Sequence, residues 1–219
     1  ADFPRQQFST DLWLTVPSGL AVEVENSYGT VKLVRLAGAA VVNRHGGVEV
    51  SGLDGPVRVE NSHADVIIDG LLGSCEIKSS HSDVLARRVG GGLNLNHGYG
   101  TITLREIGAG VVVEGAHSEI IAEDVPGTLD LRNSYEPVTL RRVGRVKLTG
   151  HHTDVDAVEV GGGLEVTTEY GFISASAVRG GLRVSGKSVG LTAGDLTGGD
   201  IQVSTSYEPV TLNGFSGPA

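Results

Sequence analysis

The hydrophobic positions of this chain follow one pattern that recurs every 17 to 19 residues. In its clearest copy, residues 22–36, Val22 and Val24 precede a short polar stretch, and Val31, Leu33 and Leu36 follow it. A spacing of two places both members of each pair on one face of a β-strand. Eleven such copies fill residues 20–217, and a fixed period of this length is typical of a solenoid.

Eighteen residues are enough for one coil of a parallel β-helix with short strands on two or three faces. Coils stacked at strand spacing, ~4.8 Å, would form a rod of roughly 50 Å. The pattern therefore predicts an all-β fold, a single-stranded right-handed parallel β-helix of about eleven ~18-residue coils. The right hand is expected because parallel crossovers are almost always right-handed. We expect residues 19–217 to form one solenoid domain.

Residues 1–18 do not fit the repeat. Apolar Leu12, Leu14 and Val16 alternate with other residues there, and a Pro17-Ser18-Gly19 turn follows. Alternation of this kind predicts one half-buried strand. Since solenoid ends usually need a cover, we expect residues 1–18 to be an N-terminal cap strand.

Composition and charge narrow the function classes. The formal net charge of −9 argues against nucleic acid as a partner. No apolar run approaches the ~18 residues needed to span a bilayer, so we expect no membrane-spanning segment. The single cysteine, Cys75, lies in an inward slot, where it is expected to be a buried structural thiol.

The candidate functional residues lie at the centre of each copy. All five tyrosines and five of the seven histidines occupy one slot there, the ring slot. Its members are Tyr28, His45, His63, His81, Tyr99, His117, Tyr135, His152, Tyr170, Ser188 and Tyr207. On stacked coils they would form one line along the rod. Two residues earlier, Asn26, Asn43 and Asn61 predict an asparagine ladder that hydrogen-bonds the turns.

Three interpretations of the ring slot remain open. Rings packed along a coil corner would stabilise the stack, with the neighbouring acids orienting each imidazole. The same line could instead bind sugar rings or an extended partner. Finally, His63, Asp65, His81 and Asp83 lie on adjacent coils, and their nitrogen and oxygen atoms are of the kinds that bind zinc.

The opening of the array, T-V-P-S-G-L-A-V-E-V-E-N-S-Y-G-T-V, and later copies such as V-R-V-E-N-S-H-A-D-V resemble a bacterial family of adhesin-like β-helix proteins of unassigned function. The resemblance covers about residues 5–217. It implies a parallel β-helix in a secreted or envelope-associated bacterial protein, and it implies no catalytic residues.

From these observations we expect a non-enzymatic, adhesin-like structural or interaction module of the bacterial cell envelope, without a cofactor. The alternatives are a glycan-binding or polysaccharide-processing β-helix, and a metal-binding surface protein. We expect the partner to be an unknown surface molecule such as a polysaccharide. Self-association through the solenoid ends is a further expectation.

Overall fold

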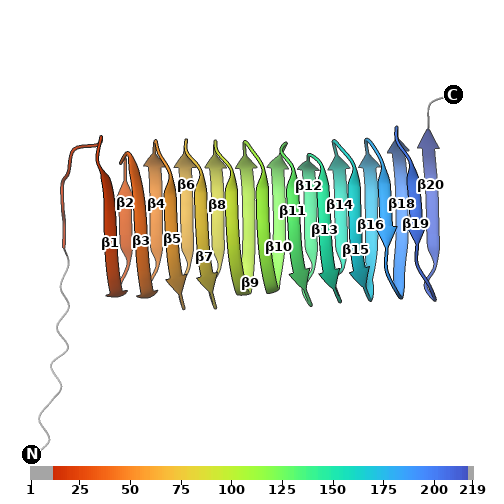
Figure 1. Ribbon diagram of the computed structural model, residues 1–219, viewed down its shortest axis with the longest axis horizontal. Coiled ribbons are helices and arrows are strands. Elements are labelled where there is room, and N and C mark those ends of the chain that lie inside the picture. Colours follow the sequence, from red (N-terminus) through yellow and green to blue (C-terminus); the bar gives the residue numbers. More distant parts are fainter. Residues whose placement is uncertain (1–11, 217–219) are drawn as a thin grey trace, which may run out of the picture.

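The computed structural model describes residues 12–216, which form a β-solenoid of about eleven coils (Figure 1). The described residues contain no helix, and each coil contributes one strand segment to each of two parallel sheets, which two long strands join into one continuous 20-stranded sheet. Every strand pairs in parallel with its equivalent one coil away, so the predicted fold class is confirmed. The right-handed winding stays a prediction.

The first sheet contains the strands that precede the ring slot. Its strands are β1 (Ala21–Tyr28), β3 (Gly38–His45), β5 (Val57–Ser62), β7 (Cys75–Ser80), β11 (Leu129–Ser134), β13 (Val146–His151), β15 (Leu164–Glu169), β17 (Leu182–Ser185) and β19 (Ile201–Ser204).

The second sheet contains the strands that follow the ring slot. Its strands are β2 (Val31–Val34), β4 (Val48–Leu53), β6 (Val66–Leu71), β8 (Val84–Val89), β12 (Val138–Val143), β14 (Val155–Val160), β16 (Gly171–Val178), β18 (Val189–Thr197) and β20 (Val210–Ser216). Two long strands, β9 (Leu93–Ile107) and β10 (Val111–Val125), run through both sheets without a break at the ring slot.

The core is the space between the two sheets, and the periodic aliphatic side chains fill it. Val59, Ile77, Leu95 and Leu131, for example, are completely buried and come from four coils of the first sheet. The register keeps equivalent slots together, since Val57 pairs with Cys75 and Cys75 with Leu93. The hydrophobic period of 18 thus becomes a set of continuous apolar columns.

Two turns close each coil, and in most coils both turns contain a residue in the left-handed region. At the ring slot, φ lies between 47° and 75° in nine coils, from His63 to Tyr207. At the opposite turn, the residue before the last apolar position of each copy, the position of Leu36 in the first, has φ between 51° and 69° in all eleven coils, from Arg35 to Gly214. We call these turns the ring corner and the aliphatic corner. Each uses a conformation that non-glycine residues seldom adopt.

The predicted cap strand is wrong for the part of residues 1–18 that the structure describes. Residues 12–17 form no strand, and Leu12, Trp13 and Leu14 are 79, 90 and 75% exposed. Figure 1 shows this segment lying apart from the coil stack, next to β1. Its alternation resembles a strand, but it makes no pairing that would hold it on the solenoid. Residues 1–11 lie outside the described residues.

Candidate functional site

The ring corner brings nine aromatic and imidazole rings into one continuous stack. Neighbouring ring centroids lie 4.6–5.6 Å apart, with interplanar angles of 2–32°. These distances follow the strand spacing, because each coil supplies one ring at the same register. The ring ladder, as we call it, consists of Tyr28, His45, His63, His81, Tyr99, His117, Tyr135, His152 and Tyr170.

The ring ladder faces solvent. Tyr99 and Tyr135 have a stacked ring on each side and Tyr170 has one on one side, yet all three remain 45–53% exposed. Of the histidines in the ladder, only His117 is half-buried and the others are exposed. The rings therefore both stack on one another and present an outer edge along most of the rod.

One predicted member, Tyr207, does not join the ladder. Ser188 occupies the ring slot in the coil between Tyr170 and Tyr207, so the stack ends at Tyr170. Tyr207 is 93% exposed and has no ring partner among residues 12–216. Conversely, His151 was not predicted as a member, yet it packs edge-on against His152 at 4.3 Å. Its place directly before the ring slot in sequence was the available signal.

Three of the acids two residues after the rings, Asp65, Asp83 and Asp154, bind the next coil rather than the imidazoles. Asp65 Oδ1 accepts a hydrogen bond from the Asp83 backbone N–H at 3.1 Å, and Asp83 Oδ1 accepts one from the Thr101 N–H at 2.8 Å. Asp154 does the same for the Phe172 N–H at 2.7 Å. The expectation that these carboxylates orient the histidines is therefore wrong. The carboxylates instead connect successive turns by hydrogen bonds to backbone N–H groups.

The metal hypothesis for His63, Asp65, His81 and Asp83 gains no geometric support. The His63 and His81 rings stack face to face with an interplanar angle of 10°, so their nitrogens run side by side instead of converging. Asp65 and Asp83 are engaged with backbone N–H groups. Within residues 12–216, no three His, Cys, Asp or Glu side chains come together as a metal-binding group.

A buried polar column supports the ring corner from inside. Asn26 donates to the Asn43 side chain at 3.2 Å, as the predicted ladder requires, and Asn43 also binds the Gly46 carbonyl at 2.8 Å. Further along, Asn133 donates to the Ser118 carbonyl at 2.7 Å. These bonds satisfy turn carbonyls that would otherwise be buried without partners.

His97 replaces asparagine in this column and is only 2% exposed. Its Nε2 lies 2.9 Å from the Ser82 carbonyl, which can only accept, so Nε2 carries the proton in the neutral ring. Nδ1 then accepts from the Ser118 hydroxyl at 2.8 Å. Burial lowers the pKa of His97, against smaller opposing effects of the Ser82 carbonyl and Asp83. Its position two residues before Tyr99, in the slot that asparagine fills in other copies, was the available signal in the sequence.

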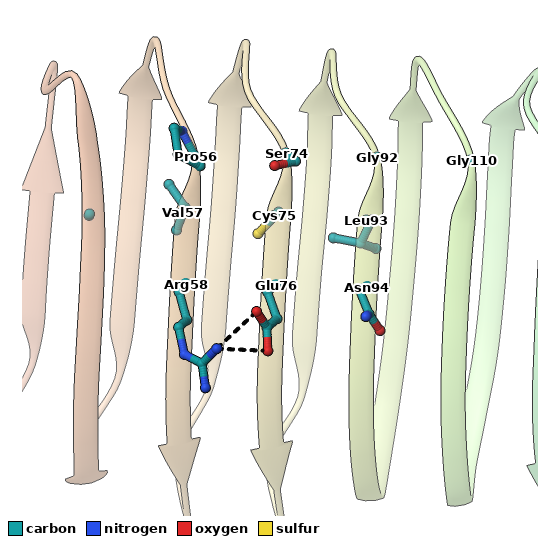
Figure 2. Close-up of a pocket in the computed structure, with 11 residues that line it drawn as sticks. Pro56, Val57, Arg58, Ser74, Cys75, Glu76, Gly92, Leu93, Asn94 and Gly110 are labelled. Carbon is teal, nitrogen blue, oxygen red and sulfur yellow. Dashed lines mark hydrogen bonds and ion pairs between the residues drawn. The ribbon is translucent and has the colours of Figure 1, made fainter.

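Away from the ring corner, a groove of about 510 Å³ crosses the first sheet (Figure 2). Glycines 92 and 110 and Pro56 line it, and its polar feature is a double hydrogen bond from Arg58 to both oxygens of Glu76, at 3.1 and 3.0 Å. Cys75 lies beneath, and burial, aided by Glu76, raises the pKa of its thiol to about 12. A thiol held protonated in this way is a poor nucleophile.

No family model matches this chain, and neither a curated protein nor a solved structure shows significant similarity to it. The described residues include no helix long and apolar enough to cross a membrane.

Proposed function

We propose that this protein is a non-enzymatic interaction module that binds an extended ligand along the ring ladder. The observation that carries the proposal is a stack of nine rings along one edge of the rod, eight of them exposed and His117 half-buried. From the family resemblance noted above, we propose an adhesin-like role at the bacterial cell envelope or outside the cell.

The ladder has the physical properties of a preformed binding surface. The rings are attached to turns that hydrogen bonds hold to the neighbouring coil, such as the bond from Asn43 to the Gly29 carbonyl and the bond from Asn133 to the Ser118 carbonyl. Rings that already stack lose little conformational freedom when a ligand lies on them, and such preorganisation favours affinity. Tyrosine adds a polar tip to each apolar ring, a combination enriched at recognition surfaces.

The chemistry of the ladder favours a polysaccharide as the ligand. Regularly spaced rings offer repeated apolar contacts, and phenol and imidazole groups offer hydrogen bonds to hydroxyls. The chain carries a net charge of −9, so an uncharged glycan avoids the repulsion that a polyanionic one would meet. We therefore propose a neutral, extended glycan rather than an acidic one.

The test is binding of the purified chain to a glycan array that includes neutral polysaccharides and oligouronides, followed by calorimetry with the best ligand. Replacing Tyr99 and Tyr135 together with alanine should weaken binding at least tenfold. Phe172→Ala is the matched control, since Phe172 is 46% exposed but lies outside the ladder, and it should bind like the unmodified protein.

Turnover assays on the array ligands and metal analysis of the same purified protein distinguish the alternative functions. Turnover of an oligouronide would show that the protein is a polysaccharide-processing enzyme and not only a binding module. Stoichiometric metal in the purified protein, lost in His63→Ala, would favour the metal-binding surface protein. Absence of binding to every glycan on the array would overturn the polysaccharide proposal.

A further inference from the structure

The two end coils of the rod leave unfinished the interactions that every inner coil completes. Inward slots are buried throughout the inner coils, but Val22, Val24 and Leu33 at one end are only partly buried. At the other end Ile201, Val203 and Leu212 are also partly buried, and Val210 and Phe215 are 42 and 65% exposed. Figure 1 shows β1 and β2 at one end of the stack and β19 and β20 at the other.

The two ends carry the same columns of slots. Val22 and Val24 belong to the column that ends in Ile201 and Val203, as successive register pairs show. Val31 and Leu33 belong to the column that ends in Val210 and Leu212. A second copy whose first coil followed the last coil of this one would therefore continue each apolar column with an aliphatic side chain.

Backbone groups at the two ends are complementary in the same register. Inside the rod, the N–H of an inward residue donates to the carbonyl that precedes the equivalent residue in the next coil, as Val31 does to Gly47 at 2.9 Å and Leu191 to Pro209 at 3.0 Å. Val210 is the equivalent residue in the last coil and has no next coil within residues 12–216 to donate to. In a second copy, the Thr30 carbonyl occupies the matching acceptor position.

The ring slots of the last coil and of a second copy's first coil would also align. Tyr207 is 93% exposed in the last coil and Tyr28 is 76% exposed in the first, and neither has a ring beyond it within residues 12–216. End-to-end stacking would place these two tyrosines on adjacent coils, where rings in this slot lie about one strand spacing apart.

We propose that the rod self-associates head to tail, with the last coil of one copy stacked on the first coil of a second copy. The interface repeats the coil-to-coil contact that the solenoid already makes throughout its length. Unpaired strand edges are a known route to association through main-chain hydrogen bonds. Because the two joined surfaces differ, the contact is heterologous and each copy can add another, giving open chains of rods.

The test measures mass by sedimentation velocity across a range of concentrations of the full chain. The unmodified protein should form dimers and longer species as concentration rises. Val24→Lys places a charge in the apolar column at the first coil, and Val203→Lys does so at the last. Either variant alone should sediment as a monomer, because each has one end blocked.

Mixing the two variants is the decisive step. Val24→Lys keeps a working last coil and Val203→Lys keeps a working first coil, so an equimolar mixture should form a species of twice the monomer mass and nothing larger. Glu23→Lys and Gln202→Lys place a lysine at outward positions of the same strands, and these controls should associate like the unmodified protein.

Three results would overturn the proposal. The unmodified chain could stay monomeric at every concentration. Both inward variants could associate as strongly as their outward controls. One single variant could dimerise by itself, which would indicate pairing of like ends instead of head-to-tail stacking. Circular dichroism of each variant, compared with the unmodified protein, confirms that the sheet has formed before its mass is interpreted.

Discussion

The ring corner and the aliphatic corner close the same coils by similar backbone geometry but are built for different tasks. Both place a left-handed residue in a column. Behind the aliphatic corner lie fully apolar side chains such as Leu71 and Ile107, which are 1% and 0% exposed. Behind the ring corner lies a polar column that includes Asn133 and His97, while rings cover the outside. One corner thus contributes mainly to the core, and the other presents an organised surface.

The sharpest test of this contrast is Leu71→Ala against Tyr99→Ala. Leu71 is fully buried at the aliphatic corner, and truncating such a side chain costs about 2–5 kcal/mol of unfolding free energy. Tyr99 is 52% exposed, and losing its stacking contributes only about 0.5–1.5 kcal/mol beyond its buried area. Urea denaturation measures both. Equal losses would show that the ladder is as much a core element as the aliphatic corner.

Glycine substitutions probe how closely the coils approach at each corner. A Cβ at Gly91, beside the aliphatic corner, would lie 2.5–2.7 Å from backbone atoms of Gly73 and Ser74. A Cβ at Gly98, beside the ring corner, would meet nothing within 4 Å. Gly91→Ala should therefore destabilise by about 1–3 kcal/mol, the usual cost of overpacking. Gly98→Ala should be neutral or slightly stabilising in thermal melts, and a loss comparable to that of Gly91→Ala would contradict the contrast.

A smaller effect on folding stability is expected from pH, and it arises from His97 at the ring corner. Because burial lowers the pKa of His97, the folded protein holds this proton less tightly than the unfolded chain does. The contribution of His97 to stability is complete above the unfolded pKa, about 6.5, and declines as the pH falls below it.

The matched variant for this pH effect is His97→Asn, which restores the residue found at Asn43, Asn61 and Asn133 in the same column. Melting temperatures between pH 7.5 and 5 should fall less steeply for this variant than for the unmodified protein. Identical slopes would show that His97 does not contribute to the pH dependence.

The smallest effect is expected from the surface ion pairs of the aliphatic corner. Arg142 donates from Nε and Nη2 to the two oxygens of Asp124, at 2.6 and 3.0 Å, and this bond lowers the pKa of the carboxyl group. Both side chains are solvent-exposed, where ion pairs contribute little and salt screens them. Arg142→Ala should leave the denaturation midpoint unchanged at physiological salt. A clear shift would mean that the outer charges of this corner support the coil stack.

The sequence by itself determined the solenoid, because a period of 18 leaves one way to bury so many aliphatic residues in short strands. Val59, Ile77 and Leu95 are buried where their slots predict, since their register depends only on repeat spacing. The same reasoning aligned Tyr28 to Tyr170 in one line.

Only the tertiary structure decided what surrounds those columns. Alternation in residues 12–16 predicted a cap strand, but a strand also needs a partner edge, and local pattern does not supply one. The acids beside the histidines bind backbone N–H groups of the next coil, as Asp83 does, because stacking brings those donors closer than sequence spacing suggests. The ring of Tyr99 is exposed because a left-handed backbone at the ring slot interrupts the alternation that buries Leu95 and His97, and hydrophobic periodicity does not encode that backbone choice.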